Sequence, residues 1–203
     1  MSIPTSKAEV RHGVDLEAFG RFTEYATAHP EDVQFVLEAR GVYEGRAAHT
    51  RAGTGPYTLG GRRIERVARE YVYHIGAHRE VEEALGFTEP TDREEPTEVA
   101  LAALTACINT AVSASALARG IELSRLETRV SIGWDPFVFL HLRDPIEHGD
   151  LINQFEGMKV RIVVDGDDLT DTDRAYLQDS VRRSAVYNLF TLGHQNTPTV
   201  ELA

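Results

Sequence analysis

The chain contains a single cysteine, Cys107, and a deprotonated thiol is well suited to nucleophilic and redox chemistry. Cys107 lies about three turns inside a helix that the alanine-rich segment 96–119 predicts. A free cysteine among apolar residues is usually a small, inert hydrophobe whose pKa is raised by burial. The dipole of its own helix cannot offset this, because that effect fades beyond the first turn. A reactive Cys107 therefore requires a cation brought from elsewhere in the fold.

Other residues that could do chemistry form no complete site. His74 and His78 are four residues apart, as in metal-binding helices, but Gly76 lies between them and no acidic ligand stands at the expected offset. Ser184 has no neighbouring histidine and acid, and the Gly-x-Ser-x-Gly motif of hydrolases is absent. The glycines of residues 53–61 lack the Lys-Ser/Thr ending of a phosphate-binding loop. We therefore expect neither a metal ion nor a cofactor.

The composition is that of an acidic globular protein. Of the 203 residues, 42% are hydrophobic and 26% are charged, and the formal net charge is −11. Nucleic acids and anionic membranes attract clustered Lys and Arg, so neither is an expected partner. Residues 1–9 lack the charged start and apolar run of a signal peptide, and a lone cysteine fits a reducing compartment. We expect the protein to be cytoplasmic.

The first half of the chain predicts one helix followed by extended segments. Apolar residues recur at helical spacing over residues 15–29, and Pro30 ends this helix. Apolar and polar residues alternate over 33–43, which predicts a half-buried strand. The glycines and proline of residues 53–61 predict turns that separate this strand from a second extended stretch at 64–73.

The second half predicts a buried helix between strands. Pro96 suits the first turn of the helix and Gly120 ends it. Although residues 99–118 approach membrane-spanning length, their many alanines and polar residues predict burial inside a soluble protein. Strands follow at 126–134 and 158–164, then a last helix from Thr170 that carries Ser184 on its apolar stripe, and a short edge strand at 200–202. This order predicts an α+β fold with antiparallel sheets.

The segment Pro96–Cys107, with the sequence PTEVALAALTAC, resembles the signature around the peroxidatic cysteine of the OsmC/Ohr family. The resemblance spans about residues 33–202. It implies an OsmC-like domain at 31–203, preceded by an N-terminal helical extension at 1–30. Three further segments resemble the family in the expected order: Ala118–Leu123, Phe155–Val160 and Ser184–Leu189.

This resemblance implies an intertwined homodimer in which antiparallel sheets wrap around two central helices, with active sites at the interface. In the family, a cysteine thiolate attacks an organic hydroperoxide, while an arginine and a glutamate hold the thiolate ready. Cys107 matches the attacking cysteine, and Arg46, which follows Gly45, matches the arginine. The family glutamate directly follows the proline, where this chain has Thr97, so Glu98 is the candidate one residue later.

The family's second cysteine, which resolves the oxidised first one, corresponds to Ser184. A serine cannot form a disulfide, so an external thiol must reduce an oxidised Cys107. The alternative interpretation is a non-catalytic dimer that binds a small apolar ligand at the interface pocket, with Cys107 merely packed. Trp134, Phe137 and Phe139 line either the core or the rim of such a pocket.

Overall fold

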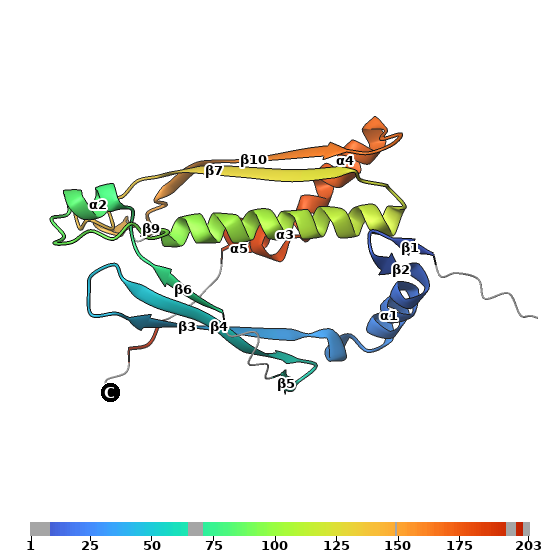
Figure 1. Ribbon diagram of the computed structural model, residues 1–203, viewed down its shortest axis with the longest axis horizontal. Coiled ribbons are helices and arrows are strands. Elements are labelled where there is room, and N and C mark those ends of the chain that lie inside the picture. Colours follow the sequence, from blue (N-terminus) through green and yellow to red (C-terminus); the bar gives the residue numbers. More distant parts are fainter. Residues whose placement is uncertain (1–8, 65–70, 149, 194–197, 201–203) are drawn as a thin grey trace, which may run out of the picture. The chain divides into compact units, whose positions relative to one another are not determined.

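The computed structural model describes residues 9–64, 71–148, 150–193 and 198–200. The chain forms two compact units, residues 1–99 and residues 100–203 (Figure 1). Each unit combines helices with antiparallel strand pairs. The predicted α+β class is therefore confirmed.

The first unit contains a helix and a four-stranded sheet in which β4 lies between β3 on one edge and β5 and β6 on the other. The predicted first helix is confirmed. The Asp15 carboxylate caps its start by accepting a hydrogen bond from the backbone N–H of Ala18, and Pro30 follows its end. The elements are β1 (Val10–Arg11), β2 (Val14–Asp15), α1 (Leu16–Ala28), the 3-10 turn η1 (Pro30–Val33), β3 (Phe35–Tyr43), β4 (Thr50–Leu59), β5 (Arg62–Ile64), β6 (Val72–Ile75) and α2 (Arg79–Ala84).

The expected turn at Gly60–Gly61 is present between β4 and β5, but the turn expected at residues 53–56 is wrong, because β4 runs as a strand through these residues to Leu59. The β3–β4 register shifts between Leu37 and Ala39, opposite the stretch that holds Gly55 and Pro56. A bulge accommodates a proline that cannot donate a ladder hydrogen bond. Within the predicted stretch at 64–73, β5 ends at Ile64 and β6 begins at Val72, and residues 65–70 lie outside the described part of the chain.

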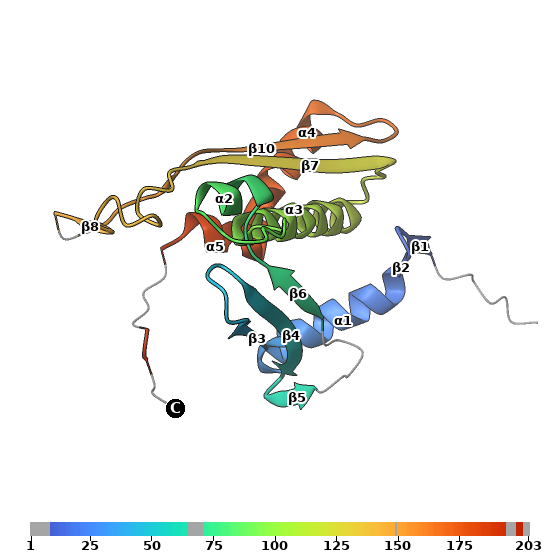
Figure 2. The same ribbon diagram turned by 60° about the vertical axis from the view of Figure 1, so that its left-hand side comes forward.

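The second unit is built around the long helix α3, which begins within the first unit. The strands β7 and β10 form an antiparallel hairpin that extends along one side of α3 (Figures 1 and 2). Gly120 ends α3 with a φ of 72°. The elements are α3 (Pro96–Arg119), β7 (Arg125–Trp134), β8 (Ile146–Glu147), β9 (Asp150–Leu151), β10 (Phe155–Asp165), α4 (Asp171–Asp179), the 3-10 turn η3 (Ser180–Arg183) and α5 (Ala185–Thr191).

The last part of the chain differs from the single helix expected from Thr170 onward. Thr170 and Asp173 do form a capping box at the start of α4, but the chain then passes through η3 and begins a separate helix, α5, after Ser184. Ser184 is thus a helix cap rather than a residue inside a helix. Val200 is not in a strand, and residues 201 and 202 lie outside the described residues.

The hydrophobic core of the second unit lies between α3, α4 and the inner face of the hairpin. The core residues of α3 follow helical spacing, and the Asn109 side chain accepts a hydrogen bond from Thr128 of β7 at 2.7 Å. The inward residues of β7 and β10, such as Val130 and Val160, pack against this helix. The buried cluster consists of Leu104, Ile108, Val112, Ala116, Ile121 and Leu177.

The expectation that α3 is buried holds for one face only. Small side chains on another face are exposed in the single chain: Ala103, Ala106, Thr110 and Ala114. By length and composition this helix could cross a membrane, but core helices of soluble proteins pass the same test. The packed face of α3 shows that it serves as a core helix of the second unit.

The central position of Leu104 predicts a large loss of stability when its side chain is shortened. We expect Leu104→Ala to lower the free energy of unfolding by about 2–5 kcal/mol, because the lost contacts leave a cavity in the core. Leu151→Ala is the matched control, since Leu151 is 81% exposed. Chemical denaturation monitored by circular dichroism measures both; equal effects would contradict this assignment of the core.

Candidate functional site

Cys107 faces the beginning of α5, which is 79 residues later in the chain. The backbone N–H of Val186 donates a hydrogen bond to the Cys107 Sγ at 3.5 Å, and the Ser184 side chain and the Ala185 N–H also bond to this sulfur. Ser184 is 1% exposed and caps α5, because its Oγ accepts a hydrogen bond from the Tyr187 N–H at 3.1 Å. Three donors from the start of one helix therefore converge on a thiol carried by another.

The surroundings of Cys107 favour its thiolate. Burial raises the pKa of Cys107, but the hydrogen bonds from Ser184, Val186 and Ala185 lower it, and the net pKa lies below the usual value. Donors stabilise a thiolate more than a neutral thiol, because the thiolate is the stronger acceptor. Neutral donors at the start of α5 thus lower this pKa, and the expected cation beside the thiolate stays a prediction.

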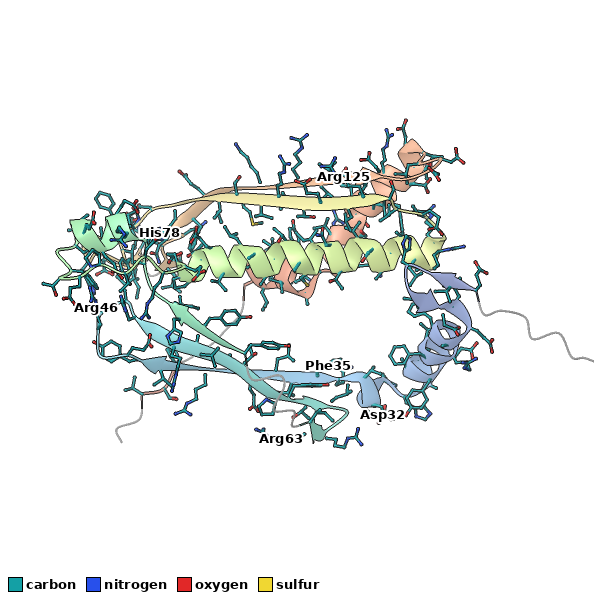
Figure 3. The ribbon with its side chains drawn as sticks, in the orientation of Figure 1. Asp32, Phe35, Arg46, Arg63, His78 and Arg125 are labelled. Atoms are coloured by element: carbon teal, nitrogen blue, oxygen red, sulfur yellow. The ribbon has the colours of Figure 1, made fainter. Side chains whose placement is uncertain are left out.

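Arg46 lies in the turn between β3 and β4, in the first unit, where Figure 3 labels it. Its Nη2 donates a hydrogen bond to the carbonyl oxygen of Thr88 at 2.6 Å and lies 3.9 Å from a carboxylate oxygen of Glu82. The guanidinium also lies over the ring of Phe87, 5.0 Å from its centre. The Arg46 side chain remains 30% exposed, so its charge is held in place but still accessible.

The carboxylate that accompanies Arg46 is Glu82, which the sequence analysis did not single out. Glu82 is completely buried on α2; one of its oxygens lies 2.6 Å from the His49 Nε2, and the other accepts a hydrogen bond from the Thr91 N–H at 2.6 Å. The Thr91 backbone N–H lowers the pKa of Glu82; burial opposes this, and His49 adds to the lowering. Glu82 stands between Glu80 and Glu83 in the sequence, and nothing in the local sequence distinguishes it from these two glutamates.

Glu98 pairs with His78 rather than with Arg46. Its carboxylate lies 2.8 Å from the Nε2 of His78, which Figure 3 labels, and both side chains are exposed. The hydrogen bond from His78 lowers the pKa of Glu98, and the same bond raises the pKa of His78. Arg46 and Glu98 belong to the first unit and Cys107 to the second, so the roles of Arg46 and Glu98 stay predictions.

The structure separates the two histidines that have metal-site spacing. His74 lies on β6 and pairs with Glu44 at 2.9 Å, whereas His78 immediately precedes α2. The pair therefore does not share a helix face. Within the described part of the chain, no group of three or more His, Cys, Asp and Glu side chains could hold a metal ion.

The aromatic residues near the end of β7 are on the surface of the chain. Trp134, Phe137 and Phe139 are 41%, 53% and 52% exposed, and the rings of Trp134 and Phe139 lie 6.1 Å apart. They do not belong to the core of this chain. A separate pocket of about 520 Å³ is lined in part by Ile132 and Phe155.

The sequence matches the family described as OsmC-like protein over residues 90–201. The chain belongs to this family. The matched segment covers α3 with Cys107, the β7–β10 hairpin and α5 with its cap Ser184. The resemblance stated from the sequence is therefore confirmed at the level of the family.

Several crystal structures are similar to this OsmC-like chain. An OsmC-like protein from Mycoplasma pneumoniae is 11% identical, covers 77% of this chain and 88% of its own, and has a TM-score of 0.47. An organic hydroperoxide resistance protein from Elizabethkingia anophelis is 13% identical, covers 79% of this chain and 91% of its own, and has a TM-score of 0.49. The organic hydroperoxide resistance protein OhrB of Bacillus subtilis is 19% identical, covers 78% of this chain and 91% of its own, and has a TM-score of 0.42. No curated protein matches the sequence.

The contacts of Ser184 predict a selective effect on the thiol. We expect Ser184→Ala to raise the pKa of Cys107, because one donor to the sulfur is lost. The pH dependence of iodoacetamide labelling measures this pKa. The same change removes a helix cap, which costs about 1 kcal/mol.

Thr170→Ala is the matched control for this measurement. Thr170 caps α4 through its side chain, which hydrogen-bonds to Asp173 and not to the thiol. Both variants should lose a similar amount of stability, and only Ser184→Ala should change the labelling profile. An equal shift in both variants, or none in Ser184→Ala, would show that the Ser184 hydroxyl does not act on the sulfur.

Proposed function

We propose that this OsmC-like protein is a one-cysteine thiol peroxidase that reduces organic hydroperoxides. The observation that carries the proposal is the set of hydrogen bonds from Ser184, Ala185 and Val186 to the Sγ of Cys107. These donors favour the thiolate, which is the form that attacks a peroxide. The chain's single cysteine and its family membership support the same activity.

The reaction proceeds in two stages. The Cys107 thiolate attacks the terminal oxygen of a hydroperoxide, the O–O bond breaks, and the alkoxide takes up a proton to leave as an alcohol. Cys107 becomes a sulfenic acid. An external thiol then attacks the sulfenic sulfur and releases water, and a second thiol reduces the mixed disulfide to regenerate Cys107. External thiols are required because Ser184 stands where the family's resolving cysteine is expected.

Two charged residues complete the proposed site. The guanidinium of Arg46 supplies a positive charge that stabilises the thiolate and the departing alkoxide. Glu98, one helical position after the family's glutamate, contributes a carboxylate to the same machinery. Both roles rest on the resemblance, and the observed exposure of Arg46 is compatible with contact to a substrate.

We also propose that the working form is an intertwined cytoplasmic homodimer, with residues 31–203 as the OsmC-like domain and residues 1–30 as an extension. Two features support the dimer. Small side chains of α3 leave a face exposed, and such a face allows a second helix to approach closely. None of the residues of β3 is buried, and Phe35 and Leu37 are 59% and 76% exposed. A sheet needs one covered apolar face to be stable.

The second candidate is a non-catalytic dimer that binds a small apolar ligand. The exposed aromatic residues Trp134 and Phe139 favour it, as does the pocket lined by Ile132, Met158 and Phe190. In that case Cys107 is a packing residue. Its labelling by iodoacetamide at neutral pH would then be slow, and Cys107→Ser would leave ligand-induced thermal stabilisation unchanged.

One equivalent of an alkyl hydroperoxide should convert Cys107 to a sulfenic acid. The adduct is trapped with a dimedone-type reagent and located by mass spectrometry of the intact, reduced protein. Cys107→Ser is the blank for the reagent. If the wild-type protein gives no adduct at low peroxide equivalents, the peroxidase proposal fails.

The position of Ser184 allows the missing second cysteine to be restored. We expect Ser184→Cys to form an internal disulfide with Cys107 after one equivalent of hydroperoxide, because the Ser184 side chain already contacts that sulfur. The disulfide is detected as a linked peptide pair in a non-reducing digest. Thr191→Cys, at the other end of α5, is the control; linkage in the control but not at position 184 would contradict the assigned geometry.

A further inference from the structure

Glu82 is the most completely buried acidic side chain among the described residues, with an exposure of 0%. An ionised carboxylate away from water is strongly destabilising unless nearby groups pair with it and hydrogen-bond to it. The proposed chemistry at Cys107 makes no use of Glu82. Its burial therefore calls for a role within its own unit.

The neighbours of Glu82 fix both carboxylate oxygens. His49, which is 3% exposed, lies 2.6 Å from Oε1, and the Thr91 backbone N–H and hydroxyl bond to the carboxylate as well. These partners come from the turn just before β4 and from the segment after α2. A carboxylate held in this way carries a negative charge in a fixed orientation.

Arg46 is the cation beside this carboxylate. Its Nη2 lies 3.9 Å from the Glu82 Oε2 and donates a hydrogen bond to the Thr88 carbonyl oxygen at 2.6 Å. Phe87 supports the arrangement, because its ring contacts the guanidinium of Arg46 at 5.0 Å and stacks on the His49 ring at 6.3 Å. A planar guanidinium with an ion pair, a carbonyl acceptor and an aromatic face is restricted in orientation as well as in charge.

We propose that Glu82 is the positioning residue that orients the Arg46 guanidinium, a part that Glu98 does not play because it pairs with His78. The inference rests on the proposed function, since it gives Arg46 a task at the thiol. In this proposal Glu82 acts on the thiol only through Arg46. His49 and Thr91 hold Glu82 in the ionised state that this task needs.

The sign of the change in the Cys107 pKa separates positioning from a simple charge effect. Removing a negative charge near the thiolate would stabilise it and lower the pKa of Cys107. If Glu82 instead holds Arg46 in place, Glu82→Gln releases the guanidinium and raises the pKa of Cys107, by about one unit. A purely structural role would lower the melting temperature and leave this pKa unchanged.

The experiment compares Glu82→Gln with Glu83→Gln, an exposed neighbour on α2 that makes the same change in charge. The full-length protein is labelled with iodoacetamide across a pH series, and Arg46 is labelled with phenylglyoxal and quantified by mass spectrometry. We expect Glu82→Gln to raise the Cys107 pKa and to make Arg46 react several-fold faster, with Glu83→Gln like the wild type. Glu82→Asp, which keeps the carboxylate, should change both readouts in the same direction but less.

A double variant tests whether the effect passes through Arg46. In the Arg46→Ala background, Glu82→Gln should not raise the Cys107 pKa further, because residues that act through one group are not additive. An unchanged or lowered Cys107 pKa in both Glu82 variants overturns the inference, as does an unchanged rate of Arg46 modification. Failure of the proposed function appears separately, as a wild-type protein that forms no sulfenic acid with hydroperoxide. If Glu82→Gln does not fold, Glu82→Asp decides by the same two readouts.

Discussion

The second unit of this protein depends on the contact between a sulfur atom on α3 and the first residues of α5. The Cys107 Sγ and the Val186 N–H are 3.5 Å apart although 79 residues separate them in the chain. The first N–H groups of a helix have no partner within the helix, so they are available to an acceptor. Ser184 serves both elements at once, because its oxygen caps α5 while the side chain bonds to the thiol. The hairpin β7–β10 and α4 pack on α3 and hold the two helices in this relation.

The first unit has a different organising constraint, the burial of an ionised carboxylate. Glu82, on α2, is held by Arg46 and His49, which both lie in the turn between β3 and β4, and by Thr91, which follows α2. Because a buried charge that loses a partner is strongly destabilising, these segments are bound to one arrangement. The same segments hold few buried apolar side chains, since Ala77 is the only buried hydrophobic residue among those described in residues 9–99. Polar pairing thus takes a larger share in ordering this unit than apolar packing within it.

The sequence was sufficient for elements with strong periodic patterns and clear end signals. The helices α1 and α3 and the strands β7 and β10 were predicted because capping residues, prolines and alternating apolar residues mark them. The strand β4 was missed because the glycines and proline at positions 53–56 favour turns, and only pairing with strands on both edges keeps them extended. The break before α5 was missed because Ser184 fits a helical stripe as well as a cap.

The candidate site divides in the same way. Cys107 was found from its residue type, and Ser184 was matched to the family's second cysteine by resemblance alone. The donors Ala185 and Val186 were missed because every residue except proline has a backbone N–H, so their residue types give no signal. Glu82 was missed because a buried acid has the same letter as its exposed neighbours Glu80 and Glu83, and only tertiary structure distinguishes them.

The hydrogen bond from Val186 to the sulfur has a spectroscopic consequence. An amide proton that points at a thiolate experiences a different electric field when the sulfur is protonated or oxidised. The amide resonance of Val186 in an isotope-labelled sample therefore reports the charge on Cys107. The rate at which this amide proton exchanges with deuterium reports how often the start of α5 separates from α3. The state of the thiol becomes readable in the intact protein without any attached dye or chemical trap.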